Sequence, residues 1–304
     1  MDNLTIIASG LRFPEGPVAM PDGSVILVEI EAGRITRVKP DGSTETVAET
    51  GGGPNGLALG PDGKLYCCNN GGFVYVEVQG LLVPHGTPAG YRGGSIQRID
   101  IETGAVETLY AEASNAPLCG PNDIVFDAHG GFWFTDHGKT RERSRDVTGV
   151  FYARADGSAC REVIFPLENP NGIGLSPDGK RLYVAETYTA KLWAFDIGGP
   201  GEIAPAEGLA GAGGHFLYGA PGFTYFDSLG VDSAGNICVA TIGASGISVV
   251  SPAGELAAFV ATDDPFTTNI CWGGDDLTTA YITLSGTGRL ATMRWPRPGL
   301  RLAH

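Results

Sequence analysis

PNGIGLSPDGKRLYVA (170–185) contains a polar residue, an apolar strand, a Pro-Asp-Gly turn and a second apolar strand. Apolar residues at alternate positions predict β-strands, and Gly-containing turn sequences between two such runs predict a hairpin. The same pattern occurs five more times along the chain, as PEGPVAMPDGSVILV (14–28), PNGLALGPDGKLYCC (54–68), PNDIVFDAHGGFWFT (121–135), FDSLGVDSAGNICVA (226–240) and TNICWGGDDLTTAYIT (268–283).

A second predicted hairpin follows each of these six. The second hairpins are 33–47, 95–109, 149–163, 191–203, 246–260 and 288–302. Six copies of two hairpins make six four-stranded sheets, and a radial arrangement protects their edges by closing the ring. The sequence therefore predicts an all-β fold, a six-bladed β-propeller, as one domain over 1–304. LTIIA (4–8) is left over and is expected to pair with the last blade and close the ring.

Charge, apolar runs and cysteine spacing exclude several classes of protein. The chain has 304 residues and a formal charge of −14, which disfavours nucleic acid and anionic membranes as partners. No apolar run approaches the ~18 residues of a membrane span, and the first residues lack the features of a secretion signal. The six cysteines show no C-x-x-C pair and are expected to be reduced thiols. A soluble, cytoplasmic protein is the expectation.

A common register turns the repeat into a candidate site. Seven residues before the first position of each turn dipeptide stands an Asn, Asp or Glu. These six ring positions are Glu15, Asn55, Asn122, Asn171, Asp227 and Asn269. Equivalent positions at the start of each innermost strand should converge on the propeller axis at one face. Such residues also suit turns, but six in one register favour a common site.

Two carboxylates and four amides suit a divalent cation. The carboxylates neutralise its charge, and amide oxygens complete an all-oxygen shell of the kind preferred by hard ions such as Ca²⁺, Mg²⁺ and Mn²⁺. The absence of Cys and His at these positions argues against a structural zinc site.

Four motifs in order, F-P-E-G-P, P-N-D-I-V-F-D, P-N-G-I-G-L-S-P-D-G-K and F-D-S-L-G-V-D, resemble the regucalcin/gluconolactonase family from about residue 11 to 298. The resemblance implies a metal-dependent lactonase in which Glu15, Asn171 and Asp227 hold one divalent ion. It implies that Asn122 contacts the metal, directly or through water, or the substrate, and that Asp227 is also the catalytic proton acceptor and donor. Family members use Ca²⁺, Zn²⁺, Mn²⁺, Mg²⁺ or Fe²⁺, and we expect Ca²⁺ first.

The end of the second strand in blade 3 should return to the face that carries the ring, so His137 and Asp136 are expected to contact the substrate. The long connections 71–94, 137–148 and 208–226 are expected to gather on the same face. Long loops on one face of a rigid scaffold usually shape a binding site.

Specificity is expected to depart from that of sugar-lactone relatives, which often carry an Arg where this chain has Gly120. The loops instead offer aromatic residues that can stack on an apolar ring, or that simply pack the loops onto the blades. These residues are Phe73, Tyr75, Tyr91, Phe216, Tyr218, Phe223 and Tyr225. We therefore expect a small-molecule lactone other than a plain aldonolactone.

Two other functions remain open at this level. A calcium-dependent phosphotriesterase of the diisopropyl-fluorophosphatase type shares the propeller and a similar Glu, Asn, Asn, Asp shell. A non-catalytic calcium-binding propeller would need the ring but no substrate cavity.

Overall fold

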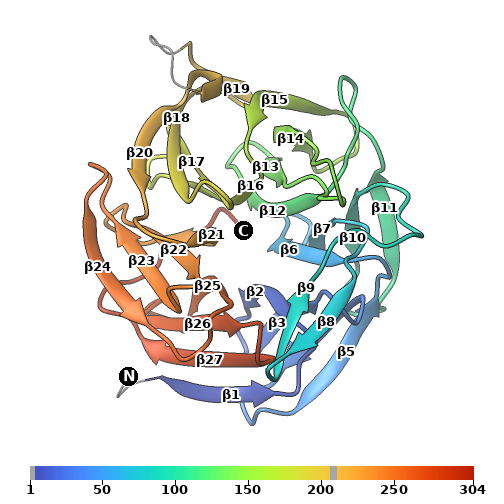
Figure 1. Cartoon of the computed structure of the whole chain (residues 1–304), viewed down its shortest axis with the longest axis vertical. Coiled ribbons are helices and arrows are strands. Elements are labelled where there is room, and N and C mark those ends of the chain that lie inside the picture. The colour runs from blue at the N-terminus through green and yellow to red at the C-terminus, as the bar shows by residue number, and fades with distance from the viewer. Residues whose placement is uncertain (1–3, 206–210) are drawn as a thin grey trace.

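The computed structural model describes residues 4–205 and 211–304, and within these ranges the regular elements are strands apart from one short 3₁₀ turn at Gly211–Gly213. Six antiparallel sheets stand radially around a central axis (Figure 1). The predicted all-β, six-bladed propeller is confirmed.

Each blade runs outward from an innermost strand near the axis. Blade 1 consists of β2 (Pro14–Ala19), β3 (Val25–Glu29), β4 (Arg34–Val38) and β5 (Thr44–Glu49). Blade 2 consists of β6 (Pro54–Leu59), β7 (Leu65–Asn69), β10 (Ser95–Ile99) and β11 (Val106–Tyr110). Blade 3 consists of β12 (Pro121–Phe126), β13 (Gly131–Asp136), β14 (Thr148–Arg154) and β15 (Cys160–Leu167).

The other three blades follow the same order. Blade 4 consists of β16 (Pro170–Leu175), β17 (Arg181–Glu186), β18 (Lys191–Gly199) and β20 (His215–Gly219), with the short β19 (Glu202–Ile203) also paired to β18. Blade 5 consists of β21 (Tyr225–Val231), β22 (Ile237–Ile242), β23 (Gly246–Val250) and β24 (Leu256–Ala261). Blade 6 consists of β25 (Thr267–Gly273), β26 (Thr279–Leu284), β27 (Arg289–Arg294) and β1 (Thr5–Ser9).

Ring closure comes from the N-terminal strand, as LTIIA predicted. β1 pairs antiparallel with β27, from Thr5 opposite Thr292 to Ser9 opposite Arg289. The prediction that 288–302 forms a complete second hairpin was wrong, because β1 occupies the outer edge where its second strand would pair. The segment after β27 instead crosses to blade 5, where the amide of Leu300 donates to the carbonyl of Val231 at 2.9 Å.

Blade 4 departs from prediction in a similar way. Only two residues, β19, follow β18 as its hairpin partner, and the outer strand of the blade is β20. Residues 215–219 of the predicted loop 208–226 are therefore blade edge and 225–226 begin β21, while 208–210 lie outside the described residues.

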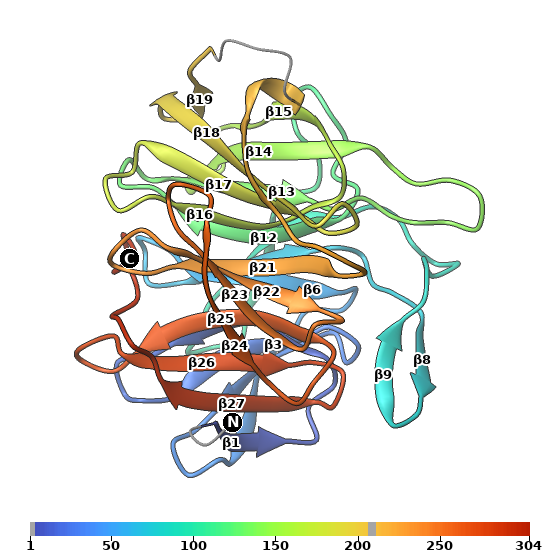
Figure 2. The same ribbon diagram turned by 60° about the vertical axis from the view of Figure 1, so that its left-hand side comes forward.

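The connection 71–94 also contains regular structure. It forms a hairpin of β8 (Tyr75–Val78) and β9 (Leu81–Pro84), which stands out from the body of the propeller (Figure 2). The amide of Leu82 donates to the carbonyl of Gly286 at 2.8 Å, which ties this hairpin of blade 2 to blade 6.

The core is divided among the interfaces between blades. In the described part of the chain, one buried apolar cluster fills each of the six interfaces. Between blades 2 and 3, for example, Tyr66 and Phe126 pack edge to face with ring centroids 5.0 Å apart. All six cysteines are free, and four of them are buried. None of the described elements is a helix of the length and apolarity that a membrane span requires.

Candidate metal centre and active site

The six ring residues lie at an irregularity that every blade repeats. In each blade the pairing of the innermost strand with the second strand shifts register beside the ring position, as between Glu15 and Val18 in blade 1. A bulge of this kind bends the strand and re-aims a side chain, and bulges are common next to active sites. The alternation of the sequence did not reveal these bulges.

Small residues after the ring positions let the innermost strands approach one another at the axis. Gly16, Gly56 and Gly172 each follow a ring residue, and a Cβ on any of them would meet the backbone of the next blade. At Gly16, which also has φ of +52°, that Cβ would lie 2.5 Å from the carbonyl oxygen of Asn55. The P-E-G and P-N-G motifs are therefore required by backbone packing.

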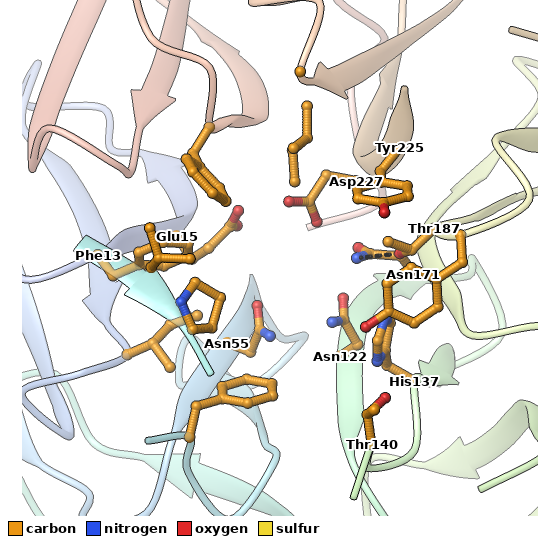
Figure 3. A pocket seen from close by; sticks show the side chains of 18 of the residues that line it. Phe13, Glu15, Asn55, Asn122, His137, Thr140, Asn171, Thr187, Tyr225 and Asp227 are labelled. Atoms are coloured by element: carbon orange, nitrogen blue, oxygen red, sulfur yellow. Dashed lines mark hydrogen bonds between the residues drawn. The ribbon is translucent and has the colours of Figure 1, made fainter. Parts of the chain in front are cut away.

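Five ring residues converge on one cavity, as the register predicted. Glu15, Asn55, Asn122, Asn171 and Asp227 line its floor (Figure 3). The sixth ring residue supports the first: the side-chain amide of Asn269 donates to Glu15 Oε2 at 2.8 Å.

Three oxygen atoms at this floor are buried and accept no hydrogen bond. They are Glu15 Oε1, Asn122 Oδ1 and Asn171 Oδ1. The amide nitrogen of Asn171 donates to Thr187 Oγ1 at 3.1 Å, which leaves its oxygen as the free end. A buried acceptor without a partner costs about 1–3 kcal/mol, so three together on one cavity fit a cation that would accept all three as ligands.

The electrostatics of the floor agree with that fit. Burial raises the pKa of Glu15, and the pKa of Asp227 lies well above its ordinary value because of burial first and the negative charge of Glu15 next. Glu15 is 2% exposed, whereas Asp227 is partly open to the cavity. Two like charges in a poorly solvated site repel, and a dication would stabilise both in their ionised form. No three His, Cys, Asp or Glu residues cluster in the described ranges, so the candidate shell depends on the amides.

His137 lies where the sequence predicted, on the wall of the same cavity. Its ring packs against Tyr188 with centroids 5.8 Å apart, and its backbone carbonyl accepts a hydrogen bond from Asn169 at 2.7 Å. Burial lowers the pKa of His137 to about 4, so the ring is neutral near pH 7.

Asp136 does not line the cavity, which corrects its predicted contact with substrate. It is fully buried and accepts hydrogen bonds from the backbone amides of Cys119, Gly120 and Gly138. The polar residues that end the second strands of blades 1, 2 and 4 do the same: each accepts an amide one or two residues before the Pro that begins the innermost strand. These residues are Glu29, Asn69 and Glu186. The polar side chains at the ends of these second strands therefore hold the neighbouring loops by hydrogen bonds, and they do not form a second layer of the site.

Gly120 likewise does not face the substrate space. It is buried, it is absent from the cavity wall, and a Cβ there would lie 2.8 Å from the carbonyl oxygen of Gly138. Substrate selection in this chain must therefore be argued from the residues that do line the cavity.

The cavity holds about 420 Å³ and has aromatic walls. Of the seven predicted aromatic residues, Phe73, Tyr75, Phe223 and Tyr225 line it. The other three do not: Phe216 and Tyr218 pack on Trp193 and Phe226 as parts of the blade edge, and the hydroxyl of Tyr91 donates to the carbonyl of Cys119.

Three further aromatic residues of the wall were missed by the sequence analysis. They are Phe13, Tyr188 and Phe266. A signal was present for two of them, because Phe13 and Phe266 stand two and three residues before ring positions, much as Tyr225 stands two before Asp227. Tyr188 follows the second strand of blade 4, and nothing in its spacing distinguished it.

Comparison with known proteins agrees with this architecture. The chain is 25% identical to a gluconolactonase of Zymomonas mobilis, over 93% of this chain and 79% of the relative. It is 30% identical to lactonase drp35 of Staphylococcus haemolyticus, over 83% of this chain and 70% of the relative. The crystal structure of a calcium-binding protein, regucalcin, from Agrobacterium tumefaciens has the same fold, with a TM-score of 0.71, 17% identity, and coverage of 96% of this chain and 95% of that one.

The family model described as the SMP-30/gluconolactonase/LRE-like region matches residues 13–286, which includes all six ring positions. The match extends over most of the chain and agrees with the predicted resemblance. The chain therefore belongs to the SMP-30/gluconolactonase/LRE-like family.

Proposed function

We propose that this protein is a metal-dependent lactonase that hydrolyses a small lactone to its hydroxy acid. The observation that carries the proposal is the set of three buried, unpaired oxygen acceptors beside Asp227 at the floor of a mostly apolar cavity. The names of the two relatives, a gluconolactonase and a lactonase, support lactone hydrolysis as the reaction.

Glu15, Asn171 and Asp227 would hold one divalent cation, with Asn122 as a fourth contact. Their donor atoms are all oxygen, which favours Ca²⁺ over softer ions, and the regucalcin neighbour is described as calcium-binding. When bound, the cation supplies Lewis acidity that polarises the lactone carbonyl.

Asp227 is the group that moves the proton, because its carboxylate faces the cavity. It takes a proton from the attacking water as the new carbon–oxygen bond forms, and it returns the proton to the ring oxygen as the ester bond breaks. The products are one carboxylic acid and one hydroxyl on the same molecule. Asn122 orients the water or the substrate from blade 3, and the neutral ring of His137 contacts the substrate from the wall.

The test is lactone hydrolysis by protein freed of metal and then reconstituted. After dialysis against a chelator, with metal content verified, we expect no turnover of any lactone in a screen of sugar, aliphatic and aromatic lactones. Addition of Ca²⁺, Mn²⁺, Mg²⁺ or Zn²⁺ should restore it. Full activity in verified metal-free protein would rule out metal dependence. Calcium binding without turnover of any substrate would indicate a non-catalytic binding protein.

A phosphotriesterase is the second candidate, because an apolar cavity above two carboxylates also suits an uncharged phosphate ester. There a carboxylate oxygen of Asp227 would attack phosphorus and expel one ester group as the leaving alcohol or anion. Water would then attack the Asp227 carboxyl carbon, release the phosphate product and regenerate the carboxylate. The kcat/KM values for phosphotriesters and for lactones separate the two reactions. A single turnover of a phosphotriester in ¹⁸O-labelled water then tests the mechanism, since direct attack places unlabelled carboxylate oxygen in the product and general-base catalysis places labelled oxygen there.

A further inference from the structure

The cavity above the ring is a slot between two aromatic walls. Phe13 packs against Tyr75 and Phe266, with centroids 5.3 and 6.1 Å apart, and Tyr75 packs against Phe73 at 6.3 Å. These four residues, the first wall, come from segments of blades 6, 1 and 2.

The second wall comes from the opposite half of the propeller. His137, Tyr188, Tyr225 and Phe223 form a continuous row, with successive centroids 5.8, 5.4 and 5.2 Å apart. They belong to segments of blades 3, 4 and 5, so the two walls face one another across the axis. Figure 3 shows Phe13 on one side of the ring residues and Tyr225 and His137 on the other.

Charge is confined to the floor of the slot. Glu15 and Asp227 are the charged residues of the lining, and both belong to the ring. Above them most of the lining is aromatic or aliphatic, with Ile30, Val83 and Ile242 among the aliphatic residues. Its uncharged polar side chains include those of Thr140, Thr187 and Thr224. Two arginines lie nearby without lining the slot: Arg141 pairs with Asp146 at 2.6 Å, and Arg145 pairs with Glu168 at 3.0 Å while its guanidinium lies 5.0 Å from the centroid of the Tyr188 ring.

A sugar lactone fits this slot poorly. It carries several hydroxyl groups, and each one that is buried without a partner costs roughly 5- to 150-fold in affinity. An apolar ring or chain between aromatic faces loses no hydrogen bonds with water and gains stacking contacts.

Resting on the lactonase function proposed above, we propose that the substrate is an apolar lactone whose aromatic or alkyl body lies between the two walls and carries few or no hydroxyl groups. One buried donor of the first wall is left for it, because the Tyr75 hydroxyl has no hydrogen-bond partner. A lactone offers a carbonyl and a ring oxygen as acceptors, so Tyr75 can donate to one of them while the body of the molecule stays apolar.

The experiment compares three lactones on the metal-reconstituted protein: a benzo-fused δ-lactone, a δ-lactone with an alkyl tail, and glucono-δ-lactone. Each kcat/KM is divided by the rate constant of that lactone with hydroxide, which removes differences in intrinsic reactivity. The two apolar lactones should exceed glucono-δ-lactone by about 100-fold or more.

Two variants test whether the walls are responsible. Tyr225→Ala removes an aromatic face from the second wall and should reduce the apolar preference about 10-fold. Phe216→Ala is the matched control, because Phe216 is 55% exposed, lies outside the cavity and packs on the edge of Trp193. It should leave the preference unchanged.

Binding of a substrate analogue that is not hydrolysed tests the apolar-substrate inference separately from the lactonase proposal. The lactam analogue of the benzo-fused lactone resists hydrolysis, so calorimetric titration should report its affinity, weakened about 10-fold by Tyr225→Ala and unaltered by Phe216→Ala. A preference for glucono-δ-lactone that Tyr225→Ala leaves intact would overturn the apolar-substrate inference and leave the lactonase standing. If the lactam binds but no lactone is hydrolysed, the lactonase proposal fails, and the substrate assignment fails with it.

Discussion

Asp227 and Glu15 carry the same charge at the same floor, yet their surroundings differ. Glu15 Oε2 accepts hydrogen bonds from the amide of Gly16 and from Asn269, each at 2.8 Å, and the side chain is 2% exposed. Asp227 is partly open to the cavity. A fixed, enclosed carboxylate suits a ligand, whereas one that reaches the substrate space can also exchange a proton.

The corresponding prediction separates turnover from metal binding. Asp227→Asn keeps an oxygen ligand but removes the base, so kcat should fall by roughly 10²–10⁴ while some metal stays bound. Glu15→Gln should weaken metal binding about 10-fold or more. At saturating metal this variant should keep much of the wild-type kcat. Metal content and steady-state kinetics of both variants measure this. Near-normal turnover in Asp227→Asn would show that Asp227 is not the base.

Lys139 is an unusual residue beside the site. Its side chain is fully buried, and Nζ donates to Asn70 Oδ1 at 3.0 Å and to the carbonyl of Gly72 at 2.7 Å. It lies 3.9 Å from the ring centroid of Phe73, in the first wall of the slot. Burial lowers the pKa of Lys139 to about 7, opposed by Asp136 and Asp146.

This pKa predicts how stability varies with pH. Below pH 7 the Lys139 ammonium is protonated in both the folded and the unfolded chain. Burial of this charge in the folded state therefore lowers the free energy of unfolding there. Between about pH 7 and 10 the unfolded chain binds the proton more strongly, so the folded state gains up to about 1.4 kcal/mol per pH unit. The free energy of unfolding of wild type relative to Lys139→Met should therefore rise from pH 7 to 9, by about 1–3 kcal/mol in urea titrations.

Lys180→Met is the matched control for this measurement, because Lys180 is exposed in a turn. Its stability difference from wild type should stay constant over the same pH range. A constant difference for Lys139→Met as well would mean that Lys139 keeps its proton throughout.

At the scale of strands, packing at the axis predicts an effect of Gly16→Ala. Both the positive φ and the 2.5 Å approach of a Cβ to the carbonyl oxygen of Asn55 oppose the substitution. Gly63→Ala is the control: Gly63 has φ of +74°, but nothing lies within 4 Å of its Cβ, so it should cost only the backbone strain of about 1–2 kcal/mol. Gly16→Ala should cost about 1–3 kcal/mol more, measured by denaturant unfolding. Equal losses would refute the close approach of the two strands.

The strands also show what the sequence can predict. The innermost hairpins and the common register of the ring followed from period-2 alternation and turn spacing, which are local properties. The outer strand of blade 4 did not, because β20 is separated from β18 by a long connection, and pairing at that distance leaves no local pattern.

Side-chain direction at strand ends was the other limit. The sequence placed Asp136 and His137 at the correct end of blade 3, but spacing alone does not tell whether a side chain points to the axis or back to a neighbouring loop. His137 does the first and Asp136 the second. The aromatic walls were predicted only in part for the same reason. The sequence showed which aromatic residues lie in the loops, but it did not show which of their side chains point into the cavity.

On the scale of the whole molecule, the ring is closed by one short strand. β1 adds the outer edge of blade 6, and Ala8, 6% exposed, joins the apolar cluster between blades 6 and 1. The same interface carries the contact of Asn269 with Glu15 at the axis. Closure of the propeller and geometry of the candidate metal shell are therefore coupled at this interface.

Ala8→Asp and Ser9→Asp form a matched pair that tests this coupling. Both place one negative charge on β1, but Ala8 is buried in the cluster whereas Ser9 is exposed. Burying the charge at Ala8 should cost about 3 kcal/mol or more, detach β1 and expose the edge of β27, which promotes association between chains. Because blades 6 and 1 then separate more easily, the metal should also bind about 10-fold more weakly, while Ser9→Asp should match wild type in unfolding, light scattering and metal titration. Unchanged metal affinity in a destabilised Ala8→Asp protein would show that the shell keeps its geometry without the closing strand.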